Sequence, residues 1–184
     1  TTKQRSTVAE IYAQIIADLS SAETLLPDVT ANGKFYTATK WAAKAYLAKV
    51  YFQQNNFAKA FQSANEVIAG NKFTLDNNFS NRYSKGLSKE GILSIVDSLG
   101  NYQPGANLRG AFRSDIGLPN FRFTDQYYSV ATARASDLRK AWYSTTLQPG
   151  FNVLTKFNKN NFNLPLVHLT EIKLIRAEAG AETG

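Results

Sequence analysis

Aromatic rings and arginines gather in one irregular stretch of this sequence, residues 98–150. Aromatic faces stack on flat apolar surfaces such as the C–H faces of sugar rings, and planar guanidinium and amide groups hydrogen-bond to hydroxyls. This composition predicts a binding site for a sugar-like ligand. The residues expected to contact that ligand are Tyr102, Arg109, Arg113, Trp142 and Tyr143, with Asp115 and Asn120 as further polar candidates.

A structural role competes with ligand binding for each of these rings, because aromatic side chains also fill hydrophobic cores. Packing is the favoured interpretation for rings that lack a polar group or follow a helical register, namely Phe112, Phe121, Phe123 and Tyr127. Tyr102 and Trp142 fit either role equally well. Outside the stretch, Trp41 and the single histidine, His168, lie on apolar helical stripes and are expected to be packed core residues.

The sequence offers little for catalysis. It contains no cysteine and one histidine, so thiolate metal sites and Ser–His nucleophiles have no basis. Asp76, Asn78 and Ser80 alternate as in a cation loop, but the glycine and the distal glutamate of a calcium loop are missing, which favours a turn. Glu171 and Glu178 lie about 10 Å apart along one helix, a spacing that suits a glycosidase, yet that helix is expected to be buried. We therefore predict a protein that is not an enzyme and uses no metal or cofactor.

Two amphipathic helices separated by a polar break organise the segment Thr39–Asn71. The break falls at Gln54–Asn56, apolar residues recur at helical spacing on both sides of it, and Gly70 ends the second helix. Small residues that allow close approach of the two helices are Ala42, Ala43, Ala45, Ala48, Ala60 and Ala64. This is the layout of a tetratricopeptide hairpin, a unit of about 34 residues.

One further helix is predicted before this hairpin, and another after the irregular stretch. The first begins with a capping box at Thr7 and Glu10 and ends at Pro27. Its expected buried face consists of Val8, Ile11, Ile15, Leu19, Ala22 and Leu26. The last helix is expected over Leu164–Glu182, with apolar residues around most of its circumference, so it should be largely buried.

Short elements are predicted between the hairpin and the last helix. Ile92–Val96 is compact and β-branched and reads as a strand, and Phe73–Leu75 is a short extended piece. A short helix is expected to start at Thr124, and another over Ser136–Tyr143. The predicted fold class is therefore mainly α, a tetratricopeptide-like helical hairpin scaffold with an irregular, loop-rich lobe and minor β structure.

Composition limits the classes of function further. The 184 residues are 43% hydrophobic and 12% aromatic, which is typical of one folded domain. No apolar run approaches the roughly 20 residues of a membrane span, and the absence of methionine favours a processed or excised piece of a longer protein. The net charge of +7 is dispersed. A soluble helical surface explains it better than a face for an anionic partner, and nucleic-acid binding, which needs a clustered basic stripe, ranks last.

Five blocks follow one another along the chain: the helix through Ile11–Leu26 that ends at Pro27, the hairpin Tyr36–Ile68, the strand Glu90–Ile95, the turn Ser136–Arg139 and the helix Leu164–Ala179. In this order they resemble the motifs of SusD/RagB-type proteins, the glycan-binding outer-membrane lipoproteins of bacterial nutrient uptake systems. Leu138 stands where that family has proline, and His168 where it has arginine.

The resemblance implies a single SusD/RagB-like domain over residues 1–184, with a helical scaffold at 6–71 and 164–182 and a loop-rich lobe at 72–163. It implies non-enzymatic binding of oligosaccharide or polysaccharide at the cell surface and delivery to a SusC-like TonB-dependent transporter. Membrane attachment is expected only through a lipid anchor outside this chain. The alternative is a tetratricopeptide-like protein-interaction module that binds a peptide in its helical groove. The charge adds the weaker expectation that an anionic glycan is preferred.

Overall fold

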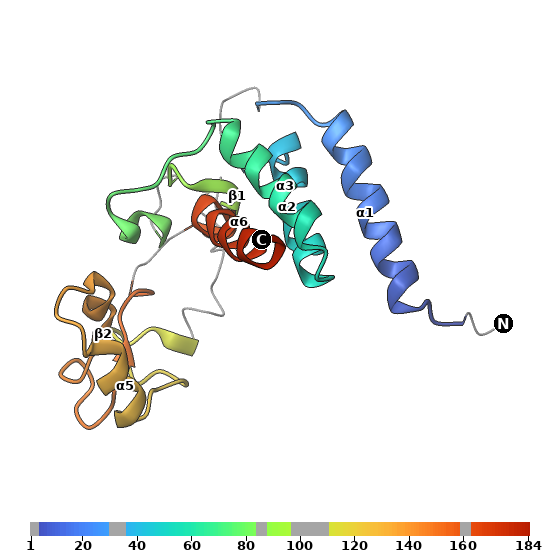
Figure 1. Cartoon of the computed structure of the whole chain (residues 1–184). Coiled ribbons are helices and arrows are strands. Elements are labelled where there is room, and N and C mark those ends of the chain that lie inside the picture. The colour runs from blue at the N-terminus through green and yellow to red at the C-terminus, as the bar shows by residue number, and fades with distance from the viewer. Residues whose placement is uncertain (1–3, 30–35, 84–87, 97–110, 159–162) are drawn as a thin grey trace. The chain divides into compact units, whose positions relative to one another are not determined.

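The computed structural model describes residues 4–29, 36–83, 88–96, 111–158 and 163–184 (Figure 1). The chain divides into two compact units. The helical unit comprises Thr1–Arg82, Leu87–Ile95 and Pro165–Gly184, and the loop-rich unit comprises Tyr83–Gly86 and Val96–Leu164. That both belong to one domain over residues 1–184 stays a prediction. None of the described helices is long and apolar enough to cross a membrane.

The described part of the helical unit is built from the α-helices α1 (Val8–Leu25), α2 (Lys40–Gln53), α3 (Phe57–Ala69) and α6 (Leu169–Thr183). Helix α2 packs against α1, α3 and α6, and α3 packs against α2 and α6 (Figure 1). The predicted hairpin is therefore confirmed, with its break at the expected place. The core of the unit lies where α2, α3 and α6 meet.

Side-chain caps and small residues explain why α2 and α3 form a close pair. The Thr39 hydroxyl accepts a hydrogen bond from the backbone N–H of Ala42, and the Asn56 side chain accepts one from Lys59 at 3.3 Å. Between them Asn55 has a φ of 57°, a conformation that asparagine tolerates and that reverses the chain. The fully buried residues at the contact are Ala45, Ala48, Ala60 and Ala64, as predicted.

Gly70 ends α3, but steric room, rather than backbone freedom, is the reason for glycine there. Its φ is −63°, and the left-handed conformation belongs to the next residue, Asn71. A Cβ atom on Gly70 would lie 2.4 Å from Cη2 of Trp41. Trp41 is buried, as expected for a core residue. The indole ring therefore packs directly on the backbone at the end of α3.

Helix α1 has the predicted capping box, but its buried face differs from the prediction. Val8 is 70% exposed, and Ile11 and Ile15 are exposed as well. The predicted residues Leu19, Ala22 and Leu26 are half-buried, and in the first half of the helix the half-buried side carries Tyr12 and Ile16 instead. The apolar arc of α1 is wider than the surface that its one main neighbour, α2, can cover. Two ion pairs tie the C-terminal part of α1 and the residues after it to α2: Lys44–Glu23 at 3.0 Å and Lys40–Asp28 at 2.9 Å.

The last predicted helix is wrong over its first five residues, which form strand β4 (Leu164–His168). Pro165 biases Leu164 to extended conformations, and pairing with β1 keeps this segment in a strand. Helix α6 starts at Leu169 instead. It is also less buried than predicted: Leu174 is 64% exposed. Its buried stripe is Leu169, Ile172, Ile175 and Ala179.

Strand β1 (Gly91–Ile95) appears within one residue of its predicted position and pairs with β4 in a two-stranded sheet. The backbone N–H of Leu169 then donates to the carbonyl of Glu90 at 2.9 Å, which joins the start of α6 to the start of β1. Upstream, Asn78 accepts a hydrogen bond from the Ser80 backbone at 2.9 Å in a turn that leads into the 3₁₀-helix η1 (Phe79–Tyr83). This agrees with the turn expected there.

The loop-rich unit contains α5 (Asp125–Thr132), the 3₁₀-helix η2 (Leu138–Trp142) and the strands β2 (Tyr143–Ser144) and β3 (Val153–Leu154). Thr124 caps α5, as predicted, and the second short helix is confirmed as η2. Strands β2 and β3 are antiparallel, with Tyr143 opposite Leu154. A small core surrounds Leu154 and Phe157; the rings packed on it are Tyr83, Phe112, Phe123, Trp142 and Tyr143.

Candidate functional site

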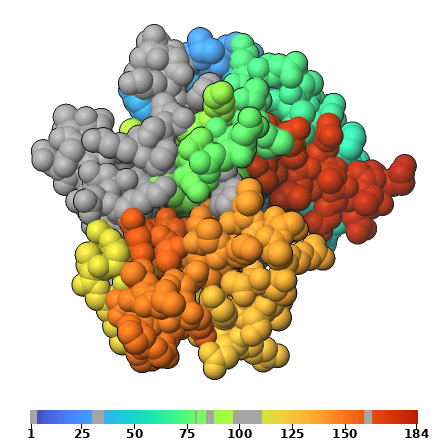
Figure 2. All heavy atoms as spheres, turned by 90° about the vertical axis from the view of Figure 1, so that its left-hand side faces the viewer, coloured from blue at the N-terminus to red at the C-terminus, as the bar shows by residue number. Residues whose placement is uncertain are grey.

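A pocket of about 570 Å³ opens within the loop-rich unit. Its walls come from α5, the segment after α5, η2, and the paired strands β2 and β3 with the residue Lys156 beyond them. In Figure 2 the described residues 111–158 of this unit are the yellow to orange spheres. The lining residues are Tyr127, Val130, Ala131, Ala133, Arg134, Asp137, Arg139, Trp142, Tyr143, Leu154 and Lys156.

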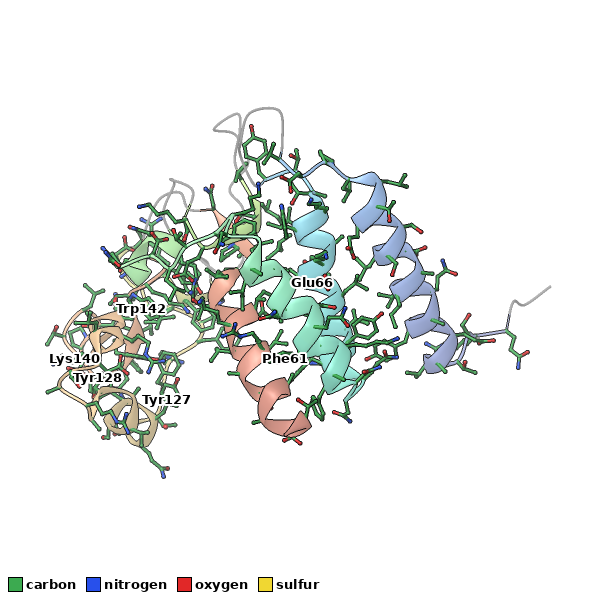
Figure 3. All side chains as sticks on the ribbon, turned by 45° about the horizontal axis from the view of Figure 1, so that its top comes forward. Phe61, Glu66, Tyr127, Tyr128, Lys140 and Trp142 are labelled. Carbon is green, nitrogen blue, oxygen red and sulfur yellow. The ribbon has the colours of Figure 1, made fainter. Side chains whose placement is uncertain are left out.

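Three aromatic rings contribute to the pocket wall. Tyr127 comes from α5 and Trp142 from the end of η2 (Figure 3). Tyr143 is the first residue of β2. The hydroxyls of Tyr127 and Tyr143 lie 3.4 Å apart, and Phe123 stacks on Tyr127 with a centroid distance of 4.8 Å. These neighbours fix the rings in place. The wall therefore offers flat apolar faces together with phenolic groups that can donate and accept hydrogen bonds.

The Tyr143 hydroxyl stays protonated at neutral pH. Burial, followed by the hydrogen bond with Tyr127, raises the pKa of Tyr143 to about 12. A neutral phenol both donates and accepts, whereas a phenolate only accepts. The Tyr143 side chain can therefore serve either the hydrogen or the oxygen of a ligand hydroxyl.

Asp137 and Arg139 form a bidentate ion pair at the edge of the pocket. Arg139 donates from Nε to Oδ1 at 2.9 Å and from Nη2 to Oδ2 at 2.6 Å. The same carboxylate accepts the backbone N–H of Arg139 at 2.9 Å and so caps η2. These contacts lower the pKa of Asp137 to about 2, with the Arg139 side chain as the largest cause. Both groups of the pair are ionised, and the two hydrogen bonds between them fix the guanidinium group against the carboxylate.

Two more cationic residues line the pocket. Lys156 places Nζ 5.2 Å from the ring centroid of Trp142 and 4.9 Å from that of Tyr83, within the range of cation–π attraction. Arg134 is exposed just after α5, and its charge contributes to the lowered pKa of Asp137. The pocket thus combines ring faces with cationic donors.

Hydrogen bonds from two buried side chains hold the pocket walls together. Asn152 donates from Nδ2 to Asp125 Oδ1 at 2.7 Å and to the carbonyl of Phe123 at 3.3 Å, which ties β3 to the start of α5. Ser114 donates from Oγ to the carbonyl of Leu154 at 2.9 Å. Because buried polar groups of this kind need their partners, the Asn152 bonds hold the start of α5 beside β3, and the Ser114 bond holds the segment around Ser114 against β3.

The structure brings together two of the five residues predicted to bind ligand, Trp142 and Tyr143. Arg113 does not line this pocket; it binds Asp115 through two hydrogen bonds, the shorter at 2.6 Å. Tyr102 and Arg109 lie outside the described residues.

Sequence reasoning missed several pocket residues. Tyr127 was assigned to packing, and Arg134 and Lys156 carried no signal beyond their charge. The Asp137–Arg139 pair was visible only as part of a turn motif, whose Asp-x-Arg spacing was the available sign of a local ion pair.

No cluster of three His, Asp or Glu side chains arranged for a metal occurs in the described part of the chain. His168, the N-cap of α6, accepts a hydrogen bond at Nδ1 from the Glu171 backbone at 3.3 Å. Burial, and then the charge of Arg82, lowers the pKa of His168. It is a packed, hydrogen-bonded histidine, as expected.

The fold defines a tetratricopeptide-like helical protein, and its loop-rich unit contains a candidate ligand-binding pocket. Residues 1–52 match the SusD-like family described as starch-binding and associating with the outer membrane. A putative sugar-binding protein from Bacteroides vulgatus is 25% identical, with a TM-score of 0.81 over 100% of this chain and 43% of its own. A SusD superfamily protein from Bacteroides thetaiotaomicron is 22% identical, with a TM-score of 0.80 over 98% of this chain and 44% of its own.

A laminarin-binding SusD-like protein is 20% identical, with a TM-score of 0.74 over 95% of this chain and 50% of its own. The chain thus spans about half or less of the length of these three proteins, and no curated protein matches it. The mainly helical, tetratricopeptide-like fold is confirmed by these structures. The family match over residues 1–52 and the fold of these structures agree with the resemblance to SusD/RagB-type proteins.

Proposed function

We propose that this chain binds oligosaccharide or polysaccharide in the pocket of the loop-rich unit, without catalysing its hydrolysis. The observation that carries the proposal is the meeting of Tyr127, Trp142 and Tyr143 with the Asp137–Arg139 pair around one cavity. Its volume of about 570 Å³ falls within the roughly 300–1,000 Å³ typical of small-molecule sites. The starch-binding description of the matched family supports the same class of ligand.

The chemistry of the wall suits a sugar better than a fully apolar ligand. A pyranose presents C–H groups on its faces and hydroxyls around its edge, so it needs flat rings and planar polar groups side by side. Trp142 and Tyr127 supply ring faces, and Arg139 and Tyr143 supply hydrogen bonds. Tyr102, Arg109 and Arg113 stay predicted ligand-binding residues that would extend the site.

Two adjacent tyrosines provide a matched test. Tyr127 lines the pocket, whereas its neighbour on α5, Tyr128, does not (Figure 3). Tyr127→Ala is expected to weaken glycan binding about three- to tenfold, the equivalent of one aromatic contact, and Tyr128→Ala to leave it unchanged. Titration calorimetry with the glycan selected on an array measures both. Equal affinities of wild type and Tyr127→Ala would contradict the proposed pocket, as would a loss confined to Tyr128→Ala.

Lack of hydrolysis is part of the proposal. Among the described residues that line the pocket, Asp137 is the one carboxylate; it is ionised and bound by Arg139, so none of these residues offers a second carboxyl group as a general acid. Incubation with plant and host polysaccharides, followed by a reducing-sugar assay, tests this point. Turnover that is absent from a mock preparation and abolished by a single carboxylate substitution would overturn it.

We further propose that the full-length protein lies at the bacterial cell surface, held by a lipid anchor, and passes glycan to a SusC-like TonB-dependent transporter. The support is the family description, which associates these proteins with the outer membrane. Affinity purification of the tagged full-length protein from outer membranes of the source bacterium is expected to recover such a transporter. Recovery of the tagged protein alone, after mild detergent extraction, would contradict this partnership.

One observation favours the alternative function, a protein-interaction module. A second cavity of about 220 Å³ lies along α2 and α6, where Phe52, Leu174 and Ile175 form an apolar strip beside the Lys49–Glu171 ion pair. An extended or helical peptide fits such a strip. Under this alternative, Leu174→Glu abolishes binding of the partner while Tyr127→Ala has no effect, which is the reverse of the outcome expected above.

A further inference from the structure

The charges around the pocket of the loop-rich unit are unequal. Its lining residues include three cationic side chains, Arg134, Arg139 and Lys156, and one carboxylate, Asp137. Asp137 and Arg139 neutralise each other through their bidentate pair, and the pKa of Asp137, lowered to about 2 chiefly by Arg139, keeps that carboxylate ionised across the physiological range. The described lining residues therefore carry a net positive charge.

Arg134 is the residue best placed to recognise an added negative charge. It follows the C-terminal cap of α5, it lines the pocket, and its side chain is exposed. Within the described residues its guanidinium group has neither a hydrogen bond nor an ion pair, since the Asp137 carboxylate is bound by Arg139. A guanidinium group presents two parallel donors, which suit the oxygens of a carboxylate or a sulfate.

Lys156 adds positive charge next to the stacking surface. Its Nζ lies 5.2 Å from the centroid of the Trp142 ring, and both residues line the same cavity. A sugar ring stacked on Trp142 therefore has a cationic group within reach of its substituents. Cation and ring together distinguish a charged sugar from a neutral one, because the ring binds both and the cation favours the charged one.

We propose that the pocket takes a negatively charged sugar residue, stacked on Trp142, whose anionic group is bound by Arg134 with Lys156 adding to the attraction. The inference rests on the proposed glycan binding and names the class of glycan. The shared chemistry is an anionic substituent on a pyranose, either the carboxylate of a uronic acid or a sulfate ester.

A glycan array that carries polygalacturonate, alginate, heparin, carrageenan, laminarin, starch, xylan and mannan provides the first measurement, with the whole chain as probe. The bound members are expected to be acidic. The best acidic ligand is then compared by calorimetry with its carboxyl-reduced form and its desulfated form, which separates uronate from sulfate recognition. Neutralising the recognised group is expected to weaken binding at least fivefold, and raising salt to weaken binding of the acidic form only.

Substitution of Arg134 tests the residue. Arg134→Gln is expected to lower affinity for the acidic glycan about fivefold, the value of one exposed ion pair, and to leave affinity for its neutralised form unchanged. Lys140→Gln is the matched control, because this substitution removes one positive charge outside the pocket. Lys140 lies on η2 in the same unit (Figure 3). Equal losses in the two variants would reduce the effect to net charge and overturn the role of Arg134.

The outcomes separate this inference from the proposed function. Preferential binding of neutral glycans that depends on Tyr127 would overturn the charged-ligand inference and leave glycan binding intact. Binding of no glycan by the whole chain would overturn the proposed function, and the inference with it. Binding of acidic glycans that is lost on neutralisation and in Arg134→Gln, but kept in Lys140→Gln, supports both.

Discussion

Glu90 is the buried charge on which the helical unit depends. Its side chain is 5% exposed, and its two oxygens accept three hydrogen bonds. The backbone N–H of Asp76 donates to Oε1 at 3.0 Å, and Arg82 Nη2 and the Thr170 hydroxyl donate to Oε2. The carboxylate thus joins the loop before η1, η1 itself and the start of α6. We predict that Glu90→Gln destabilises the chain far more than its small change in shape suggests.

The magnitude follows from what the substitution leaves behind. The side chain of Arg82 is 19% exposed, and its Nε has no partner among the described residues. Without the carboxylate, the guanidinium group keeps its burial and loses its counter-charge. The amide NH₂ of glutamine must in addition face a donor, since donors lie at both carboxylate oxygens. Removing one partner of a buried pair costs about 3–5 kcal/mol. Because Arg82 keeps some contact with water, we expect about 3 kcal/mol.

Urea denaturation followed by circular dichroism measures this loss as a change in midpoint at constant slope. Glu171→Gln is the matched control: Glu171 pairs with Lys49 at 2.8 Å, but both side chains are about one-third exposed. That pair is expected to contribute less than about 1 kcal/mol. If Glu90→Gln unfolds within 0.5 kcal/mol of the control, a figure close to the additivity error of such comparisons, the buried pair does not stabilise the unit as argued.

Acid titration gives an independent check on Glu90. Burial alone raises the pKa of this carboxyl, but the hydrogen bonds from Thr170, Asp76 and Arg82 outweigh it, so the pKa lies below its ordinary value. A carboxyl group with a lowered pKa in the folded state stabilises that state above its unfolded pKa and loses this effect as the pH falls through the folded pKa. Wild type should therefore lose more stability than Glu90→Gln between roughly pH 5 and pH 3. Parallel profiles would contradict the assigned pKa.

Three further predictions concern the helical unit. Because burial lowers the pKa of His168 and its cap on α6 needs an unprotonated Nδ1, stability should fall as pH decreases from about 7 to 5.5; His168→Asn keeps a cap acceptor for the Glu171 backbone and should flatten this profile in urea titrations. Ala60→Leu should overpack the seam between α2 and α3 and cost about 1–3 kcal/mol; an unchanged melting temperature would remove Ala60 from the seam. Gly70→Ala should cost a similar amount, since its Cβ would lie 2.4 Å from Trp41, and calorimetric melting at wild-type temperature would refute the contact.

Local signals explain which parts of the fold were predictable. The hairpin was readable because its caps, its polar break and its small residues all lie within 33 consecutive positions, Thr39–Asn71. Strand β4 was missed because its apolar residues continue into α6 without a polar break, and only its partner β1 and Pro165 decide between strand and helix. The buried face of α1 depends on which neighbour covers the helix, which periodicity alone does not tell.

The candidate site was predictable only in part, for a similar reason. Trp142 and Tyr143 were found because large rings in an irregular segment are unusual. Arg134 and Lys156 are more than twenty residues apart in the sequence and are brought to the same cavity by tertiary structure, in which Asn152 beside β3 hydrogen-bonds to Asp125 at the start of α5. Arg113 was selected for its guanidinium group, but Asp115, two residues further on, binds that group.

The two units differ in how well they tolerate substitution. The seam between α2 and α3 is made of fully buried alanines, where added volume is costly. Arg134 and Arg139, in contrast, are exposed at the pocket, and hydrogen bonds of the buried Asn152 and Ser114 hold α5 and the segment around Ser114 against β3. Exposed side chains held on such a fixed base can be exchanged with little loss of stability. The charge and hydrogen-bonding pattern of the pocket can therefore change while the hairpin stays the same, which fits the proposal that the loop-rich unit sets ligand preference.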